Sequence, residues 1–280
     1  MFDRLLSTFS LVSRIPVRVK FTFDPSRIDF WLPIVGITPA LLNLLVWAGL
    51  AMIGNIPEHH PLPVAILLLI IQYLCFNLFH LDGLMDTADA FLGSCTREKR
   101  LAILKDSRVG TYGFFAGFAV LTLKLALLAS LFPHMRECGV AAAILSFPVV
   151  GRFGAAMVPC LTSPATPEGL GRLARDSRMA RCIVGAIIGS ALWLLLACGL
   201  MHMATIIPGI HFTAASSISY SISLIAMIAA PLVLIAPLTA LFHARLYRRG
   251  IGGYTGDALG ATVETGEILT LVLAFLILNI

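Results

Sequence analysis

The chain has 280 residues, of which 58% are hydrophobic and 12% charged, and its formal net charge is +5. A soluble domain carries about a quarter charged residues and just under half apolar ones, so a water-soluble enzyme of this size is excluded. The apolar excess lies in blocks of about 20 residues, which is the signature of transmembrane helices. The positive-inside rule explains the excess of Lys and Arg better than nucleic-acid binding does, and no nucleic-acid partner is expected.

Seven segments are each long enough to cross a bilayer core, which takes about 20 residues. They cover approximately residues 33–53, 62–81, 112–133, 139–161, 180–201, 219–243 and 258–280. The connections alternate in charge, because nearly all the basic residues lie in the N-terminal segment and in the second, fourth and sixth loops. The sequence therefore predicts an all-α, polytopic membrane bundle of about seven helices with a cytoplasmic N-terminus.

Residues 1–30 precede the first predicted span. Apolar residues recur here at helical spacing, at Phe2, Leu5, Leu6, Phe9 and Val12. This pattern predicts an amphipathic helix that lies in the membrane interface, and a helix packed on the bundle explains it equally well. We treat residues 1–280 as a single membrane-embedded domain.

A polar cluster begins where the second span ends, in the run His80-Leu81-Asp82-Gly83-Leu84-Met85-Asp86-Thr87-Ala88-Asp89. If this run is helical, Asp86 lies about 40° from Asp82 and Asp89 about 20° on the other side, so the three carboxylates share one face. Hard oxygen ligands on one face suit Mg²⁺, which prefers carboxylates together with substrate phosphates and water. The alternative is a membrane-surface helix that merely carries three acids, although ionisable groups at such depth are by default functional. His80 suits a hydrogen-bonded interfacial histidine as well as a ligand.

Residues 82–111 are expected to form a cytoplasmic active-site loop. Beyond the acids, this segment contains Lys105-Asp106-Ser107-Arg108, whose cations are suitable partners for phosphate oxygens. Gly110 and Gly113 would allow a close approach to the backbone. A basic anchor at the start of the third span explains the same residues equally well.

Two basic residues, Lys124 and Arg152, lie inside predicted spans. Arg152 is expected to face a cavity or to pair with a carboxylate. Lys124 is expected to snorkel or to form a similar pair.

A second polar cluster, Gly252-Gly253-Tyr254-Thr255-Gly256-Asp257, opens the seventh span. Its glycines predict a turn with an exposed backbone, and Asp257 is predicted to be a helix N-cap. Glu264 lies on nearly the same helix face as Asp257, and Glu267 lies on the adjacent face. Carboxylates inside a span favour function, and this pair could complete a divalent-metal site opposite the Asp82 face.

At these residues the chain resembles the cobalamin synthase family, whose members are also called adenosylcobinamide-GDP ribazoletransferases. The resemblance covers nearly the whole chain and is carried by the run from Phe79 to Asp89, by Lys105 to Thr111, by Thr255-Gly256-Asp257, and by Glu264 with Glu267. It implies transfer of the adenosylcobinamide-phosphate group from adenosylcobinamide-GDP to α-ribazole or its 5′-phosphate, with release of GMP.

The resemblance also implies a Mg²⁺-dependent enzyme in the bacterial cytoplasmic (inner) membrane, with its active site facing the cytoplasm. Its expected partners are the two substrates, the lipid bilayer and other enzymes of the cobalamin pathway. The implied catalytic and Mg²⁺-binding residues are Asp82, Asp86, Asp89 and Glu264. The implied substrate-binding residues are His80, Lys105, Asp106, Arg108, Arg152, Gly256, Asp257 and Glu267. Which acid acts as the general base stays open.

Two other functions are weighed against this one. A CDP-alcohol phosphotransferase also carries aspartates at helix ends, but its D-G-x-x-A-R pattern is absent, because Gly83 is followed by Leu84-Met85-Asp86. A transporter or permease subunit would suit the charged residues inside the spans. Against a transporter, the strongest acidic cluster lies at one membrane face.

Overall fold

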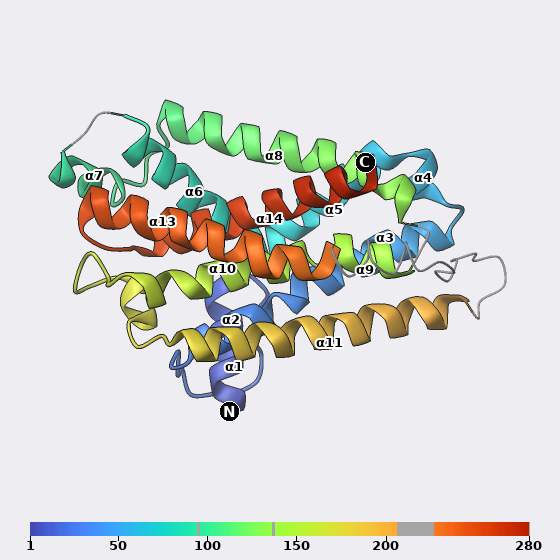
Figure 1. The fold of residues 1–280 in the computed structure, drawn as a ribbon, viewed down its shortest axis with the longest axis horizontal. Coiled ribbons are helices and arrows are strands. Elements are labelled where there is room, and N and C mark those ends of the chain that lie inside the picture. The colour runs from blue at the N-terminus through green and yellow to red at the C-terminus, as the bar shows by residue number, and fades with distance from the viewer. Residues whose placement is uncertain (94–95, 136–137, 206–226, 280) are drawn as a thin grey trace.

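The computed structural model describes residues 1–93, 96–135, 138–205 and 227–279, and this part of the chain is helical with one isolated β-bridge (Figure 1). Within these residues, seven helical segments are long and apolar enough to cross a membrane. The predicted all-α class and the predicted number of spans are confirmed. Predicted span residues 219–226 and 280 lie outside the described residues. The seven segments are Ile28–Met52, Pro61–Phe91, Thr111–His134, Val140–Leu161, Met179–Leu200, Met227–Ile251 and Gly256–Asn279.

Several of these segments consist of more than one helix. A π-helical turn, Tyr73–Asn77, joins α5 to α6, and a second one, Pro231–Ile235, precedes α13. Short 3₁₀ turns cover Phe132–His134 and Leu170–Ala174. The α-helices are α1 (Phe2–Val12), α2 (Ile28–Val35), α3 (Ile37–Met52), α4 (Ile56–His59), α5 (Pro61–Gln72), α6 (Leu78–Phe91), α7 (Arg97–Ile103), α8 (Thr111–Leu131), α9 (Cys138–Ile144), α10 (Phe147–Leu161), α11 (Met179–Thr205), α13 (Ala236–Ile251) and α14 (Gly256–Asn279).

The N-terminal helix α1 lies against the bundle near α2 (Figure 1). Leu5, Phe9 and Val12 pack into an apolar cluster with residues of the bundle, whereas Phe2 is 62% exposed. The predicted helix is therefore confirmed, and its apolar face packs on the bundle. Asp24, in the segment that follows, accepts hydrogen bonds from the Ser26 amide and the Arg4 guanidinium, and these bonds lower its pKa to about 2.

The first span begins at Ile28, five residues before the predicted start, because a buried acid at its beginning is paired. Asp29 is 1% exposed, and its carboxylate accepts hydrogen bonds from the Arg178 amide at 2.7 Å and from Arg181 Nε at 2.8 Å. A charge at this depth is tolerated when it is paired and hydrogen-bonded. The Arg181 partner comes from α11, which packs on α2.

The segment 82–111, predicted as a loop, is largely helical, and that part of the prediction is wrong. The second span continues as α6 to Phe91, and α7 follows at Arg97–Ile103. The helix persists because Gly83 lets α6 pack directly on α14: a Cβ at Gly83 would lie 3.0 Å from the Asp257 Cα. Inside the helix, the Thr87 hydroxyl donates back to the Gly83 carbonyl at 2.6 Å. The three aspartates therefore lie on a helix that continues the second span.

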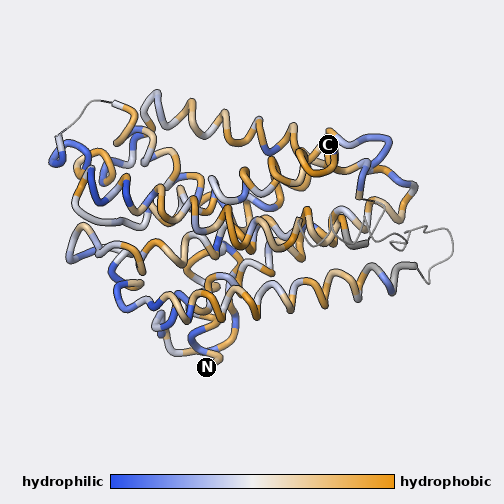
Figure 2. Tube along the Cα trace, in the orientation of Figure 1, coloured by the Kyte–Doolittle hydropathy of each residue, from blue (hydrophilic) through white to orange (hydrophobic). Residues whose placement is uncertain are grey.

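The centre of the bundle is the fourth span, and its most hydrophobic stretch is entirely buried in the protein. Its helix α10 packs against α14, α13 and α2. Figure 2 shows apolar residues along the long helices and polar residues gathered around α7 at one end of the bundle. The acidic end of α6 lies beside α7, at that same polar end (Figure 1).

Candidate active site

The three aspartates of α6 lie on a single helix, spaced as the predicted shared face requires. Asp82 is exposed, and Asp86 and Asp89 are half-buried. Within the described residues, Asp82 and Asp86 have no hydrogen-bond or ion-pair partner. Two carboxylates without partners at the end of a span are free to bind a cation or a substrate group.

Asp89 has a different environment from the other two acids. Its carboxylate accepts hydrogen bonds from the Gly110 and Gly113 amides, both at 2.8 Å, at the start of α8. A Cβ at either glycine would collide with the carboxylate, so glycine is needed for this close approach. The two glycines do allow a close approach to the backbone, and the group that approaches is the Asp89 carboxylate. Asp89 thus caps α8 and ties it to α6.

Asp257 adds a fourth acid beside the α6 carboxylates. It lies in the first turn of α14, and because that helix begins at Gly256, the prediction that Asp257 is the N-cap is wrong. The Thr255 hydroxyl donates to Asp257 Oδ2 at 2.9 Å. The Asp257 backbone touches Gly83, between Asp82 and Asp86 in the sequence of α6. The charges of Asp82, Asp257 and Asp89 all act on Asp86.

The described residues contain no group of three His, Cys, Asp or Glu side chains that would hold a metal ion by itself. Mg²⁺ is commonly bound by one or two carboxylates and completes its coordination with water and substrate phosphates. The partner-free Asp82 and Asp86, with Asp257 beside them, fit that kind of site. Like charges this close also favour a bound cation, because they repel one another otherwise.

A cavity of about 620 Å³ opens at Asp257, and Asp82 and Asp86 are not among its lining residues. Asp257 and Gly256 line it on the α14 side, Lys105 lies on the α7 side, and Glu168 belongs to the opposite loop. Lys105 is exposed and has no carboxylate partner among the described residues. The cavity therefore has a lysine without an ion-pair partner on one wall and Asp257, at the start of α14, on another.

The walls of this cavity are held together by hydrogen bonds between two loops. The Tyr254 amide donates to the Ser163 carbonyl at 3.0 Å, and the Ala165 amide donates to the Tyr254 carbonyl at 2.8 Å. The Tyr254 hydroxyl donates to the Gly171 carbonyl at 2.8 Å, and burial raises the pKa of this phenol. The loops between the fourth and fifth spans and between the sixth and seventh spans thus form one surface.

Asp106 and Arg108 form a local pair beside Lys105. The Arg108 guanidinium donates to both Asp106 oxygens, with the shortest distance 2.6 Å from Nη2 to Oδ2. These hydrogen bonds lower the pKa of Asp106 and raise that of Arg108. The Arg108 side chain is 87% exposed. Neither residue lines the 620 Å³ cavity, in contrast to Lys105.

The His80 side chain is buried, with 3% of its surface exposed. It lines a cavity of about 50 Å³, together with Gly256, and neither ring nitrogen has a hydrogen-bond partner in the described structure. A cavity of this size has room for a water molecule.

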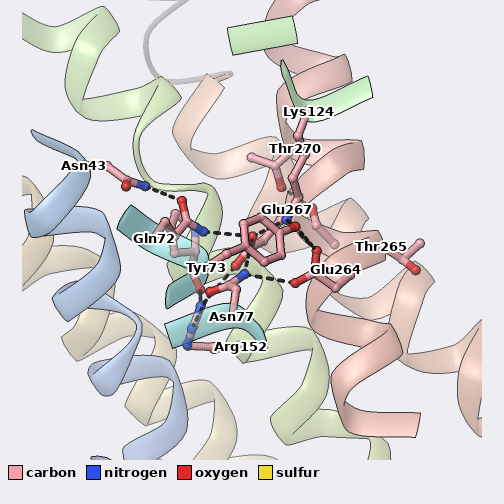
Figure 3. Close-up of polar contacts among 12 residues, drawn as sticks. Asn43, Gln72, Tyr73, Asn77, Lys124, Arg152, Glu264, Thr265, Glu267 and Thr270 are labelled. Atoms are coloured by element: carbon pink, nitrogen blue, oxygen red, sulfur yellow. Dashed lines mark hydrogen bonds and ion pairs between the residues drawn. The ribbon is translucent and has the colours of Figure 1, made fainter. Parts of the chain in front are cut away.

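Glu264, Glu267 and Arg152, all expected at the site, belong instead to a fully buried network deeper in the bundle (Figure 3). Lys124 Nζ donates to Glu264 Oε2 at 2.7 Å and to Glu267 Oε2 at 2.6 Å. Arg152 Nη1 donates to Glu267 Oε1 at 3.1 Å. Of the alternatives that the sequence left open for Lys124 and Arg152, the structure shows pairing with carboxylates, and two positive charges balance two negative ones.

Neutral side chains complete this network. The Tyr73 hydroxyl donates to Glu264 Oε2 at 2.6 Å, and Asn77 Nδ2 donates to both glutamates at 3.0 Å (Figure 3). Gln72 reaches Glu267 at 3.3 Å and accepts a hydrogen bond from Asn43 at 2.8 Å. Sequence reasoning missed the role of Tyr73. The signal was present, because Gln72, Tyr73 and Asn77 are polar in an otherwise apolar span and Asn77 ends the π-helical turn.

The structure therefore does not bring all the predicted residues to one site. Asp82, Asp86, Asp257, Gly256 and Lys105 lie at the polar end and its cavity. Glu264 lies in the buried network with both carboxylate oxygens hydrogen-bonded. It is not brought together with the three aspartates of α6.

Comparison with known proteins connects this arrangement to a family. The profile of cobalamin-5-phosphate synthases matches residues 4–275. The chain belongs to the cobalamin-5-phosphate synthase family. A relative from Fusobacterium nucleatum, an adenosylcobinamide-GDP ribazoletransferase, is 36% identical over 98% of this chain and 96% of its own length. Relatives of the same name from Citrobacter koseri and Escherichia coli are 29% and 28% identical, each over 94% of this chain and 95% of their own lengths.

No solved structure matches the chain. Membership of the cobalamin-5-phosphate synthase family confirms the resemblance seen in the sequence. It supports an enzyme over a transporter, and the family match includes both the α6 acids and the α14 segment.

Proposed function

We propose that the chain transfers the adenosylcobinamide-phosphate group from adenosylcobinamide-GDP to α-ribazole or its 5′-phosphate. The products are adenosylcobalamin or its 5′-phosphate, and GMP. The observation that carries this proposal is the match to ribazoletransferases over nearly the full length of both chains. The partner-free Asp82 and Asp86, and the neighbouring cavity lined by Asp257 and by Lys105, support it, because the donor substrate and both products bear phosphate.

In this reaction a ribazole hydroxyl oxygen forms a bond to the cobinamide-linked phosphorus, and the bond from that phosphorus to the GMP oxygen breaks. The hydroxyl proton passes to a carboxylate, for which Asp257 is the candidate. Lys105, exposed at the cavity wall, neutralises the departing phosphate. Positioning and neutralisation of charge account for most of the catalysis in such transfers.

We propose that Asp82 and Asp86 hold Mg²⁺, and that Asp257 beside them stays available to accept the proton. The bound ion would neutralise phosphate oxygens and orient the diphosphate. Glu264 is left out of this ligand set, because Lys124, Tyr73 and Asn77 already donate hydrogen bonds to its carboxylate oxygens. Asp89 serves chiefly to hold α6 and α8 together.

We further propose that the site faces the cytoplasm and that the membrane is the bacterial inner membrane. The support is the distribution of charge, since the basic residues of α7 and of the C-terminal end of α13 lie at the same end of the bundle as the acids. Contacts with other enzymes of the pathway stay an expectation.

The test is GMP release by the purified, detergent-solubilised protein with adenosylcobinamide-GDP and α-ribazole 5′-phosphate. We expect one GMP per new cobamide, loss of activity in EDTA, and recovery when excess Mg²⁺ is added. Absence of GMP from protein with an intact thermal transition would refute the transferase proposal. GMP release that EDTA leaves unchanged would refute the metal proposal alone.

A further inference from the structure

A second cavity, of about 450 Å³, lies on the outer side of α13, where this helix meets α7 and the end of α6. Three arginines line it, Arg100 from α7 and Arg245 and Arg249 from α13, and none of its lining residues is acidic. Within the described residues, none of the three forms an ion pair. This groove is separate from the candidate active site, whose cavity lies against the loops at the start of α14.

The wall that α13 gives to the groove changes from apolar to cationic along the helix axis. Leu238, Leu241, Phe242, Arg245 and Arg249 recur at spacings of three and four residues, which places them on one face. Leu238 is 57% exposed and Phe242 is 58% exposed, in a helix that is long and apolar enough to span a membrane. The apolar part of this wall therefore faces lipid, and the arginines follow within one to three turns.

Arg100 gives this groove a polar group that the protein leaves unsatisfied. Its Nε is buried and has no hydrogen-bond partner in the described structure. The guanidinium carbon lies 5.1 Å from the centre of the Phe91 ring. Gly250 makes the room, since a Cβ there would lie 3.0 Å from Arg100 Nη1 and would overlap Phe91. A desolvated guanidinium donor without an acceptor is costly, so an acceptor from outside the chain is favoured.

We propose that this groove binds an anionic phospholipid of the surrounding bilayer. The phosphate of the headgroup lies among Arg100, Arg245 and Arg249, and an acyl chain runs along Leu238 and Phe242. The charge is complementary, since three unpaired cations with no neighbouring acid lining the groove face a membrane surface that carries negative charge. Guanidinium groups also match the geometry of phosphate oxygens.

The test is native mass spectrometry of the detergent-purified full chain, titrated with phosphatidylglycerol or with phosphatidylcholine of the same acyl chains. We expect one phosphatidylglycerol to stay bound at voltages that remove phosphatidylcholine. The double variant Arg245→Gln/Arg249→Gln should weaken phosphatidylglycerol binding by about 10-fold or more. Both side chains are exposed, so this variant is expected to fold.

The matched control is Arg172→Gln/Arg178→Gln, which removes the same charge from two exposed arginines outside the groove. This control should retain wild-type binding. Equal loss in the two double variants would show general attraction to the surface and would overturn the proposal. Equal retention of the two lipids would also overturn it. A further arm adds inorganic phosphate, and full displacement of the lipid at equal concentration would identify a simple phosphate site and overturn the lipid assignment.

Discussion

At the scale of single residues, the three aspartates of α6 have different tasks although they repeat at helical spacing. Asp86 has no partner among the described residues and is surrounded by other acids. Asp89 accepts two backbone hydrogen bonds from the start of α8. Replacement of Asp86 should therefore affect activity, whereas replacement of Asp89 should also affect stability.

The first prediction concerns Asp86→Asn. We expect GMP release to fall by about 100-fold or more, because removal of a charge that stabilises a transition state costs several kcal/mol, while the thermal midpoint in detergent stays at the wild-type value. Asp176→Asn, which changes an exposed side chain outside the cavities described here, is the control and should retain full activity. Wild-type turnover of Asp86→Asn would contradict its role in the site.

The second prediction concerns Asp89→Ala. The variant leaves the Gly110 and Gly113 amides without their acceptor, and the loss of a helix cap costs about 1 kcal/mol of the free energy of unfolding. We expect a lower thermal midpoint together with reduced activity. An unchanged midpoint would show that water replaces the carboxylate without cost.

The third prediction concerns the buried charge network. Lys124→Met leaves two buried carboxylates with only Arg152 to balance them, and breaking such a pair costs about 3–5 kcal/mol. The double variant Lys124→Met/Glu264→Gln removes one charge of each sign and should recover part of that loss. Thermal unfolding of the detergent-solubilised variants measures both effects. A double variant less stable than the single variant would contradict this account.

At the scale of elements, the position of the candidate site depends on how closely α6 and α14 pack. Gly83 lies against the Asp257 backbone, and Gly260 lies against the His80 backbone. Small residues at two successive contacts allow helices to approach in a membrane. This approach places Asp257 beside the acids of α6. The network around Lys124 joins the same two helices deeper in the bundle.

The fourth prediction is that Gly260→Ala disturbs the site without changing any charge. The new Cβ would lie 2.9 Å from the His80 carbonyl oxygen, so α6 and α14 must separate. Overpacking of this kind costs about 1–3 kcal/mol, and we expect GMP release to fall along with the thermal midpoint. Gly49→Ala is the matched control, because its Cβ meets no atom within 4 Å. Equal behaviour of the two variants would contradict the close-packing argument.

At the scale of the whole molecule, the alternating charge of the connections predicts the orientation. The loop at Ser107 belongs to the basic end, and helix α4, which ends at His59, lies at the other end of the second span. Both side chains are exposed. The positive-inside rule places Ser107 in the cytoplasm and His59 outside.

The fifth prediction follows from this orientation. In a background that lacks the native cysteines, a membrane-impermeant maleimide added to intact cells should label His59→Cys and leave Ser107→Cys unlabelled. After lysis it should label both variants. Labelling of Ser107→Cys in intact cells would invert the proposed orientation and place the acids of α6 outside.

The sequence alone was sufficient for the features that depend on one segment at a time. Hydropathy predicted seven spans, because the bilayer requires about 20 apolar residues from each helix. Helical periodicity predicted that Asp82, Asp86 and Asp89 share a face. The high cost of a lone charge in a membrane made carboxylate partners one of the two alternatives expected for each of Lys124 and Arg152.

Only the tertiary structure decided which of these faces meet. Glu264 and Asp257 lie on nearly the same face of α14, yet Glu264 is held by Lys124 while Asp257 reaches the acids of α6. Asp89 is separated from Gly110 by 21 residues, and no local pattern links the two. Periodicity is a property of a single helix, whereas the partner of each side chain depends on the depth and rotation at which helices pack against one another.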